Sequence, residues 1–520
     1  MDSSKSVKRP FITFLGHSGF SIECKESLVL VDAWLSRNGA FDGTWKQVPA
    51  NHYLFEKYQN RVNNEFAGSS YIIITHAHED HFDTDFLAAL RNCKFLIPCF
   101  ENKSFRSLVL EVAHHTVSVE ELEDCRPFKI ESGIDVVAII DDNGIDEDSA
   151  IYFSTPYFNF LNQNDCKAFD KSLEFLRAKS IDILACQYAS ASAHPIAYLY
   201  SLEEKKTISL KKAEEKFTLI KDFAKKLDAG TTILCGGPAA YPELQATSDY
   251  YIDQILYSDE AIKNVWAPDF ESNKLLIPRI EQRVDISTTE GLSFSDIQKS
   301  LRAENTVARN RVRDSEMTDE EVRLVRINFI DEVLERIRIL NNHNATAKWV
   351  LSYKCTDSES FEEIVIDFEQ LTVYTSGKEL MTGADMQRIV YSAPVSTYIA
   401  LANKATRWQD IHLSFRFSIK RFPDSYSPLI HAFMLSEPRG LDTFVRKQKM
   451  LTYKIEKIRV TDQAQDYLVD RYCPHNGADL SKGIMMEGKI VCPRHGWCFD
   501  IRNNGRCDRS HARLDVKKIH

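Results

Sequence analysis

Short hydrophobic segments separated by polar connections run through the N-terminal part of the chain, a pattern typical of β-strands in a layered domain. Residues 11–15 and 28–31 are predicted strands, and residues 71–74 form a continuous apolar run, as expected for a buried strand. Residues 150–160 are again rich in strand-forming side chains. A charged amphipathic helix is predicted over residues 210–228, where its apolar side would cover a sheet.

The middle of the chain changes from this pattern to a helical one. Thr318 and Glu321 form a capping box that begins a predicted long helix reaching residue 340, with apolar positions every three or four residues. No glycine-rich phosphate loop and no group of ligand-type residues follows. We therefore expect an α+β scaffold or substrate-facing region, with strands at 347–353, 363–368, 371–375 and 412–417 and a helix at 391–403.

The C-terminal part predicts a small antiparallel β unit. Residues 483–484 and 489–491 are expected to be strands joined by a turn at Glu487 and Gly488. The expected organisation is multidomain, mixing α/β and β architecture. The expected domains are residues 1–260, residues 261–430 and residues 431–520.

Composition limits the classes of function. The chain has 520 residues, which is more than one core usually organises, and its 43% hydrophobic and 27% charged residues are typical of globular proteins. A formal net charge of −10 argues against non-specific nucleic-acid binding, since no basic excess displaces phosphate counterions. No secretory signal and no apolar run of about 18 residues is visible, so no membrane association is expected. The 12 scattered cysteines indicate reduced thiols and metal ligands, as in a cytoplasmic protein.

The strongest chemical signal lies near the C-terminus, where two short segments each supply one cysteine and one histidine. These are Cys473 with His475, and Cys492 with His495. A Rieske [2Fe–2S] centre needs two thiolates on one iron and two imidazoles on the other. Zinc ribbons are the alternative, but they usually pair two Cys-x-x-Cys loops. We predict that the four residues bind a Rieske cluster, and the segment resembles the Rieske domains of oxygenases.

The type of Rieske centre follows from that resemblance. Rieske proteins of respiratory chains carry an additional cysteine in each loop, and the two form a disulfide. Here the first loop continues through Asn476, Gly477 and Ala478 without a cysteine. The resemblance therefore implies the low-potential oxygenase type, whose cluster delivers electrons to a second metal. Cys498 and Cys507 are expected to be bystanders.

A candidate for the second metal follows the predicted strand at 71–74. His76, His78, Asp80 and His81, together with Glu79, place three imidazoles and two carboxylates within six residues. So many ligand-type side chains at the end of one strand can converge on one or two metal ions. We predict a metal site here.

The spacing of these residues resembles the metallo-β-lactamase fold, an αββα sandwich with metals at one sheet edge. Asp32 stands where that fold has an acidic residue, residues 16–23 resemble an opening hairpin of ascorbate-lactonase relatives, and Asp165 matches the fold's bridging aspartate. Two further histidines of the fold are absent from residues 142–148 and 233–238. His114, His115 and His194 are either substitutes or structural residues. These departures favour an iron site of one or two ions over dizinc, with zinc as the weaker alternative.

The combination of the two metal motifs resembles the cytidine monophosphate N-acetylneuraminate hydroxylase family. The resemblance includes residues 29–35, 75–81, 165–166 and 408–412 and covers most of residues 10–430. That family carries its Rieske domain at the N-terminus, whereas here it is C-terminal. The mechanism is therefore expected to carry over more readily than the substrate.

The resemblance implies an O₂-dependent oxidoreductase, a hydroxylase or N-oxygenase. An electron-carrier protein, either a ferredoxin or a cytochrome b5-like protein with its NAD(P)H-dependent reductase, would reduce the cluster. Iron at His76, His78, Asp80, His81 and Asp165 would then act on a small-molecule substrate, by resemblance a nucleotide sugar. Since the two centres are far apart in sequence, either domain docking or a homo-oligomer must bring them together.

Two other functions remain open. The chain could be a metal-dependent hydrolase with a regulatory Rieske domain, for which zinc in the N-terminal site would argue. It could also be a non-catalytic electron carrier, which would leave the histidine-rich segment unexplained.

Overall fold

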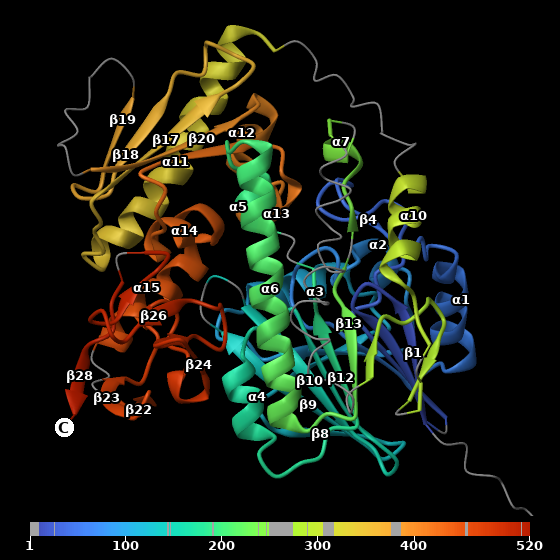
Figure 1. Cartoon of the computed structure of the whole chain (residues 1–520). Coiled ribbons are helices and arrows are strands. Elements are labelled where there is room, and N and C mark those ends of the chain that lie inside the picture. The colour runs from blue at the N-terminus through green and yellow to red at the C-terminus, as the bar shows by residue number, and fades with distance from the viewer. Residues whose placement is uncertain are drawn as a thin grey trace, which may run out of the picture. The chain divides into compact units, whose positions relative to one another are not determined.

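The computed structural model describes residues 10–519 except for positions 25, 143–144, 146, 190–191, 238, 246, 249–273, 286, 289, 305–316, 376–385, 453–455 and 511. The chain forms two compact units (Figure 1). The first consists of Met1–Asp142, Glu147–Ala191 and Lys206–Ala308, and the second of Asn143–Asp146, Ser192–Lys205 and Arg309–His520. Among the described residues, no helix combines the length and the hydropathy that a membrane span requires.

Two seven-stranded sheets form the first unit. The first sheet has the order β16 (Arg283–Val284), β1 (Phe11–Gly16), β2 (Gly19–Cys24), β3 (Ser27–Val31), β5 (Ser70–Ile73), β6 (Lys94–Pro98), β7 (Ser118–Leu122). Its strands are antiparallel from β16 to β3 and parallel from β3 to β7. The second sheet has the order β15 (Lys274–Leu276), β13 (Thr231–Cys235), β12 (Ile183–Gln187), β11 (Asn159–Asn164), β10 (Glu147–Ser154), β9 (Ile134–Asp142), β8 (Pro127–Ile130). The strands predicted from the apolar runs are confirmed.

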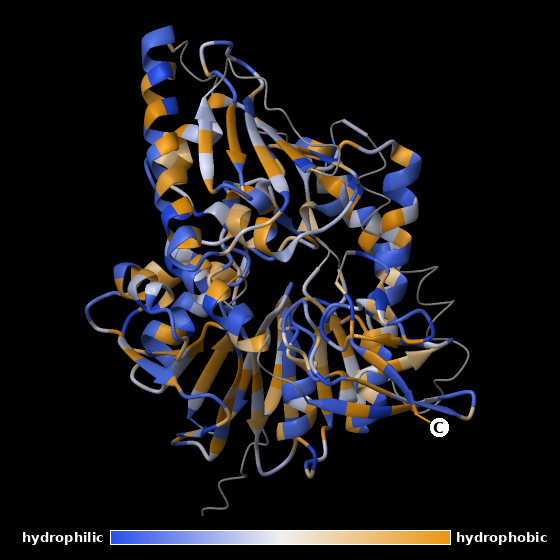
Figure 2. Ribbon diagram, turned by 90° about the vertical axis from the view of Figure 1, so that its left-hand side faces the viewer, coloured by the Kyte–Doolittle hydropathy of each residue, from blue (hydrophilic) through white to orange (hydrophobic). Residues whose placement is uncertain are grey.

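Apolar side chains of both sheets are buried in one core. Phe20 of β2 and Phe160 of β11 meet edge to face with ring centroids 5.2 Å apart, a favourable aromatic geometry. Figure 2 shows hydrophobic residues concentrated in the strands, while the connecting loops are mainly hydrophilic. Burial of this kind stabilises a fold by about 1.5–3 kcal/mol for each large apolar side chain.

Helices cover the outer faces of both sheets. Residues of α1 (Leu54–Asn60), α2 (Thr84–Ala88) and α3 (Ser104–Val112) share the core of the first sheet. Residues of α4 (Phe169–Phe175), α6 (Leu202–Leu227) and α10 (Phe294–Glu304) belong to the cluster of the second sheet. In α6, Phe217, Ile220 and Phe223 recur every three residues on the buried side. The first unit is therefore the αββα sandwich that the metallo-β-lactamase resemblance implies.

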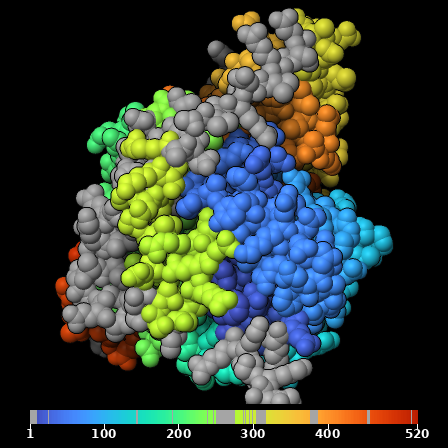
Figure 3. Space-filling model, turned by 90° about the vertical axis from the view of Figure 1, so that its right-hand side faces the viewer, coloured from blue at the N-terminus to red at the C-terminus, as the bar shows by residue number. Residues whose placement is uncertain are grey.

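The segment after the second sheet returns to the first one. Strand β16 pairs antiparallel with β1, with Val284 opposite Ile12. Figure 3 shows this return on one face, where the yellow-green residues that include α10 lie against the blue N-terminal part. Smaller elements of this unit are β4 (Lys46–Gln47), which pairs with β14 (Ala239–Ala240), the π-helix Arg61–Glu65 and α7 (Pro242–Gln245).

One end of the sandwich collects the residues of interest. Strands β3 and β5 are parallel neighbours, as are β11, β12 and β13, so within each sheet their carboxyl ends lie at the same edge. The β1–β2 turn lies at this edge of the first sheet, since Phe20 is opposite Val31 at the end of β3. The topology therefore gathers loops from many parts of the sequence at one edge.

In the second unit, a five-stranded sheet has the order β19 (Thr372–Thr375), β18 (Ile364–Asp367), β17 (Trp349–Cys355), β20 (Gln387–Ala393), β21 (Ser418–Phe422). Helix α11 (Asp319–Asn342) begins with the predicted capping box at Thr318 and Glu321. Further helices are α5 (Ala193–Ile196), α12 (Val395–Ala402), α13 (Trp408–Ser414), α14 (Pro428–Leu435) and α15 (Pro438–Thr452). The α+β prediction for this region is confirmed.

Two of the predicted elements in this sheet region are wrong in part. The helix expected over residues 391–403 begins only at Val395, because Tyr391 belongs to β20 and Pro394 is the N-cap. The strand expected over 412–417 is the end of α13, which stops where Phe415 adopts a left-handed φ of 58°. The side chains that suggested a strand over 412–417 lie on the buried side of a short helix and in the tight turn that follows it.

The C-terminal part contains two small antiparallel sheets. One consists of β22 (Lys457–Asp462), β23 (Gln465–Asp470) and β28 (Val516–Ile519). The other consists of β24 (Ile484–Met486), β25 (Lys489–Val491), β26 (Cys498–Asp500) and β27 (Arg506–Cys507), with a 3-10 turn at Leu480–Lys482. The predicted turn joins β24 to β25, with positive φ at both Glu487 and Gly488, as a two-residue hairpin loop requires.

Candidate metal centres

His17, Asp80 and His81 form a buried group at the edge of the sandwich. His17 stands in the turn between β1 and β2, and its Nε2 lies 2.8 Å from Asp80 Oδ2. The same Asp80 oxygen is 3.7 Å from His81 Nε2. The ring of His17 also lies edge-on to Trp34, with centroids 5.3 Å apart, which fixes its plane.

His76, His81 and Asp165 form a second group that shares His81 with the first. Asp165 follows β11, and its Oδ1 is 3.6 Å from His81 Nε2. His76 Nε2 lies 2.8 Å from His78 Nδ1, so His78 points toward the same place. The five residues predicted as ligands, His76, His78, Asp80, His81 and Asp165, thus lie together in the structure.

Carboxylates orient two of the imidazoles through their Nδ1 atoms. Asp32 Oδ2 is 3.0 Å from His81 Nδ1, and Asp148 Oδ1 is 3.2 Å from His76 Nδ1. Thr75 donates its backbone N–H to Asp32 Oδ1 over 2.9 Å and its hydroxyl to Oδ2 over 2.7 Å. A carboxylate on one ring nitrogen leaves the other for a metal and increases its basicity. The Nε2 atoms of His76 and His81 are the ones left at the site.

Asp165 is held from behind by a chain of polar side chains. The amide of Gln187, at the end of β12, donates to Asp165 Oδ2, and Lys216 of α6 donates to the Gln187 carbonyl oxygen. Lys216 also donates to the carbonyl oxygen of Ala189 over 2.7 Å. Gly236, beyond β13, adopts a φ of +64°, and a Cβ there would meet Asp165 Oδ1 at 3.1 Å. The site is therefore closely packed around Asp165.

Electrostatics at this edge suit a cation. Burial by itself would raise the pKa of Asp80, but the imidazoles of His81 and His17 outweigh it and lower that pKa to about 2. Burial opposes protonation of His81, yet Asp80, Asp165 and Asp32 hold its pKa well above the usual value. Burial lowers the pKa of Lys216 to about 8. Asp80 thus remains ionised, and His81 lowers the pKa of Asp165 as well, which concentrates negative charge around the imidazoles.

Several buried atoms at this edge have no hydrogen-bond partner among the described residues. They include Asp80 Oδ1, His81 Nε2 and Asp165 Oδ1. Leaving a buried polar atom unsatisfied costs about 1–3 kcal/mol, and more where the group is charged. A metal ion coordinated by these atoms would remove that cost. The mixed nitrogen and oxygen donors fit iron, manganese or zinc.

The sequence alone does not reveal every residue of the group. In the sequence His17 stands out only as part of a hairpin, and Asp148 as part of a segment that lacks histidine. What the two residues share is their place in the fold, since each lies at a strand end next to the segment of His76 to His81. Glu79 accepts a hydrogen bond from the backbone N–H of Phe41, on a neighbouring loop.

The three histidines considered as substitutes lie apart from both groups. His114 and His115 contact each other beside Thr116, at the exit from α3. His194 contacts Tyr198 and Tyr200 in the second unit. None of the three is among the ligand groups that the described residues form.

The two cysteine–histidine loops near the C-terminus have matching backbone geometry. Gly477 N–H donates to Cys473 C=O over 2.8 Å, and Gly496 N–H donates to Cys492 C=O over 3.0 Å. Both glycines have a left-handed φ, 67° and 65°, which a tight loop requires and which glycine adopts without strain. The rings of His475 and His495 meet edge to face, with centroids 4.5 Å apart.

The two thiols lie within hydrogen-bonding distance of each other and share a buried environment. Burial raises the pKa of Cys473, and Cys492 adds to this effect. Although burial opposes it, hydrogen bonds from Cys473 and from the backbone N–H groups of His495 and Arg494 lower the pKa of Cys492. Backbone N–H groups directed at the sulfurs stabilise thiolates, which a cluster requires. The four side chains fit a Rieske cluster.

Cys498 and Cys507 lie on β26 and β27, beyond the second loop. Cys498 Sγ is 3.5 Å from the carbonyl oxygen of Gly496.

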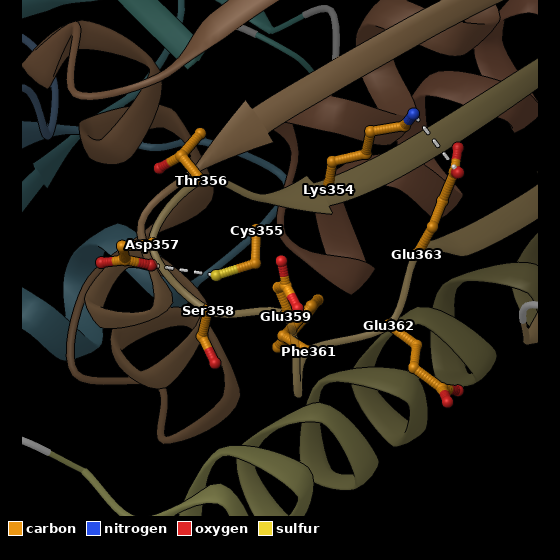
Figure 4. A pocket seen from close by; sticks show the side chains of 9 residues that line it. All are labelled: Lys354, Cys355, Thr356, Asp357, Ser358, Glu359, Phe361, Glu362 and Glu363. Carbon is orange, nitrogen blue, oxygen red and sulfur yellow. Dashed lines mark hydrogen bonds and ion pairs between the residues drawn. The ribbon is translucent and has the colours of Figure 1, made fainter.

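A cavity of about 490 Å³ lies in the second unit at the end of β17 (Figure 4). It is lined largely by acidic and polar side chains, with Cys355 directed at Asp357 and Lys354 at Glu363.

Comparison with known proteins supports the C-terminal assignment. Residues 442–519 match the model of the Rieske [2Fe–2S] domain. This segment is a Rieske domain. Proteins named as Rieske 2Fe–2S iron–sulfur proteins in Mycolicibacterium smegmatis and Mycobacterium tuberculosis are each 23% identical to the chain over 95% of its length and 97% of theirs. A Rieske cluster is a redox centre, so the match supports the [2Fe–2S] cofactor predicted for this segment.

Other likenesses cover a smaller part of the chain. A metal-dependent hydrolase of Cereibacter sphaeroides is 40% identical over 70 residues, which are 14% of this chain and 24% of the hydrolase. The diiron β-hydroxylase CmlA of Streptomyces venezuelae aligns with a TM-score of 0.37 at 15% identity, over 53% of this chain and 54% of that one. The metallo-β-lactamase fold protein YhfI of Bacillus subtilis aligns with a TM-score of 0.33 at 13% identity, over 54% of this chain and 100% of that one.

Proposed function

We propose that the protein is a Rieske-coupled, O₂-dependent non-haem iron oxygenase, a hydroxylase or N-oxygenase of a small molecule. The observation that carries the proposal is the presence, in one chain, of a Rieske domain and a separate buried histidine–carboxylate group. A Rieske cluster supplies electrons one at a time, and iron in the second site would supply O₂ activation. The presence of both sites in one chain is best explained if the cluster supplies electrons to a metal bound at the second site.

The proposed roles of the N-terminal residues follow from their contacts. His76, His78, Asp80, His81 and Asp165 bind one or two irons, and His17 joins them from the β1–β2 turn. Asp32 and Asp148 hold the imidazoles of His81 and His76 in orientation. Burial of the group excludes bulk water, which protects oxidising chemistry from unproductive proton and electron loss.

The partners and the substrate are proposed from the family resemblance. An electron-carrier protein, a ferredoxin or a cytochrome b5-like protein, delivers electrons from an NAD(P)H-dependent reductase. The substrate class is a nucleotide sugar, so cytidine monophosphate N-acetylneuraminate is the first probe. Two irons are the form to test first, because the ligand-type side chains fall into two groups that share His81.

Metal analysis tests the cofactor part of the proposal. We expect the full-length protein to contain iron beyond the two atoms of its cluster. In the double variant His76→Ala, His78→Ala the additional iron should be lost while the cluster, observed by electron paramagnetic resonance after reduction, remains. Zinc in place of the additional iron, at full occupancy, would contradict an oxygenase.

Turnover tests the reaction itself. Product formation by the full chain should need O₂, NAD(P)H, the reductase and the carrier together, and a chemical reductant should replace the carrier in part.

A rival function, metal-dependent hydrolysis, is favoured by the 70-residue likeness to a hydrolase. Hydrolysis predicts turnover of the substrate under strict anaerobiosis, independent of the oxidation state of the cluster.

A further inference from the structure

Tyr426 contacts a ligand of the Rieske cluster from outside the segment that matches the Rieske domain. It stands between β21 and α14, and its hydroxyl lies 3.4 Å from His475 Nε2. The two rings meet edge to face with centroids 5.7 Å apart. The 3.4 Å between the Tyr426 oxygen and His475 Nε2 is longer than the usual N–H···O range of about 2.7–3.2 Å, so the contact is weak and open to tightening when the charge on His475 changes.

The surroundings hold Tyr426 and His475 in this arrangement. Trp497 stacks on His475 with centroids 4.2 Å apart and planes within 2°, and it meets Tyr426 edge to face at 5.5 Å. Gln448 donates its side-chain N–H to the carbonyl oxygen of His475 over 2.7 Å. The imidazole of His475 therefore has little freedom to turn away from the tyrosine.

The segment that carries Tyr426 is anchored on the five-stranded sheet. Arg421 forms an ion pair with Asp424 at 2.6 Å, and the hydroxyl of Ser425 donates to the side-chain oxygen of Gln387 over 2.5 Å. Ser427 then caps α14 by accepting from the backbone N–H of Ile430. Tyr426 is thus presented to His475 by a fixed turn, with anchors on both sides of it.

The chemistry of imidazole determines the direction of this hydrogen bond. When the cluster iron takes one ring nitrogen, the other carries the proton and donates it. Nε2 is the nitrogen that faces the tyrosine, so Nδ1 is the atom left to bind the cluster iron. The Nε2–H group then donates to the oxygen of Tyr426. The oxidised cluster carries one more positive charge than the reduced one, so it makes Nε2–H the more acidic donor. The hydrogen bond is therefore stronger in the oxidised state.

We propose that Tyr426 is a positioning residue of the Rieske centre that lowers its reduction potential by accepting the Nε2–H of His475. An interaction that favours the oxidised state makes reduction less favourable, so removing it must raise the potential. The inference rests on the Rieske domain and is independent of the reaction at the N-terminal site. It also makes the potential depend on the region that precedes the Rieske domain.

The substitution Tyr426→Phe tests this, because it removes the hydroxyl and keeps the ring against Trp497. In the full-length protein we expect the midpoint potential, measured by redox titration and electron paramagnetic resonance, to shift upward with an unchanged amount of cluster. Tyr374→Phe is the matched control, since its hydroxyl bonds to Gln370 and contacts no cluster ligand. The control should keep the wild-type potential.

A second measurement separates tuning from packing. Pulsed electron paramagnetic resonance in D₂O detects the exchangeable ring protons of the two histidine ligands, and the Tyr426→Phe signal should change for one histidine only. An unchanged potential in Tyr426→Phe at full cluster content would overturn the proposal. Loss of the cluster in this variant would also overturn it, because the hydroxyl would then serve assembly and not the potential.

Discussion

At the scale of single residues, the N-terminal site depends on side chains held in place by their neighbours. His17 and Asp80 meet at 2.8 Å because the β1–β2 turn and the loop after β5 end at the same sheet edge. Asp165 keeps its orientation through Gln187, which in turn accepts from Lys216. Such outer partners commonly change metal affinity about 10–100-fold when they are removed.

Gly236→Ala is predicted to weaken metal binding at the N-terminal site. A Cβ at Gly236 would lie 2.5 Å from Gln187 Cγ and 3.1 Å from Asp165 Oδ1, so Gln187 must move and release Asp165. We expect at least a tenfold weaker metal affinity, measured by chelator competition, with an unchanged Rieske spectrum. Gly133→Ala is the control, because it has a similar left-handed φ of +85° and open space around its Cβ. Backbone strain costs both variants about 1–2 kcal/mol of stability, so it cancels in the comparison. An equal loss of metal affinity in both variants would refute the specific role of Gly236.

The sequence reveals those residues of the site that are close together along the chain. His76, His78, Asp80 and His81 share one segment, so their composition alone indicates a metal. His17, in the β1–β2 turn, and Asp148, on β10, are single residues far from that segment, and only the pairing of strands into sheets brings them to the site. Chain topology, which no local pattern contains, decides which isolated histidines become neighbours.

At the scale of elements, periodicity predicts the strands and long helices well where one side is buried. The helix that begins at Thr318 and the amphipathic helix α6 follow directly from spacing and capping. The segment around His412 does not, because its helix is short and buried and ends at a left-handed Phe415. A buried short helix and a strand have the same apolar content, so periodicity over so few residues cannot separate them.

The buried His412 predicts an acid sensitivity of the second unit. Burial, with a smaller effect of His431, lowers the pKa of His412 to about 3. Between pH 6.5 and 3 the unfolded chain binds a proton there that the folded chain does not, so the unfolding free energy falls as pH falls, by up to about 1.4 kcal/mol per pH unit. In His412→Gln this dependence should be smaller, as measured by thermal unfolding at pH 5 and pH 7.5. The exposed His115→Gln is the control, and equal pH dependence in the wild type and His412→Gln would contradict the assignment.

At the scale of the whole molecule, the two candidate centres belong to separate units of the chain. The N-terminal group lies entirely in the first unit and the four Rieske ligands in the second. Each has its own apolar core, so each unit provides the rigid support that a metal site needs. Because the two centres are built independently, their cofactors are expected to load independently.

This independence gives a prediction for the complete protein. Cys473→Ser removes one thiolate ligand, and His495→Ala removes one imidazole, so either change should abolish the Rieske spectrum. The metal of the N-terminal site should remain at its wild-type content, measured by elemental analysis after correction for the cluster iron. Cys498→Ser is the matched control, because this cysteine lies three residues after His495 on β26 and is expected to be a bystander. Its cluster should therefore form normally. Loss of both metals from either ligand variant would show that the two centres assemble as one, and the proposed transfer of electrons between separate sites would then have to be abandoned.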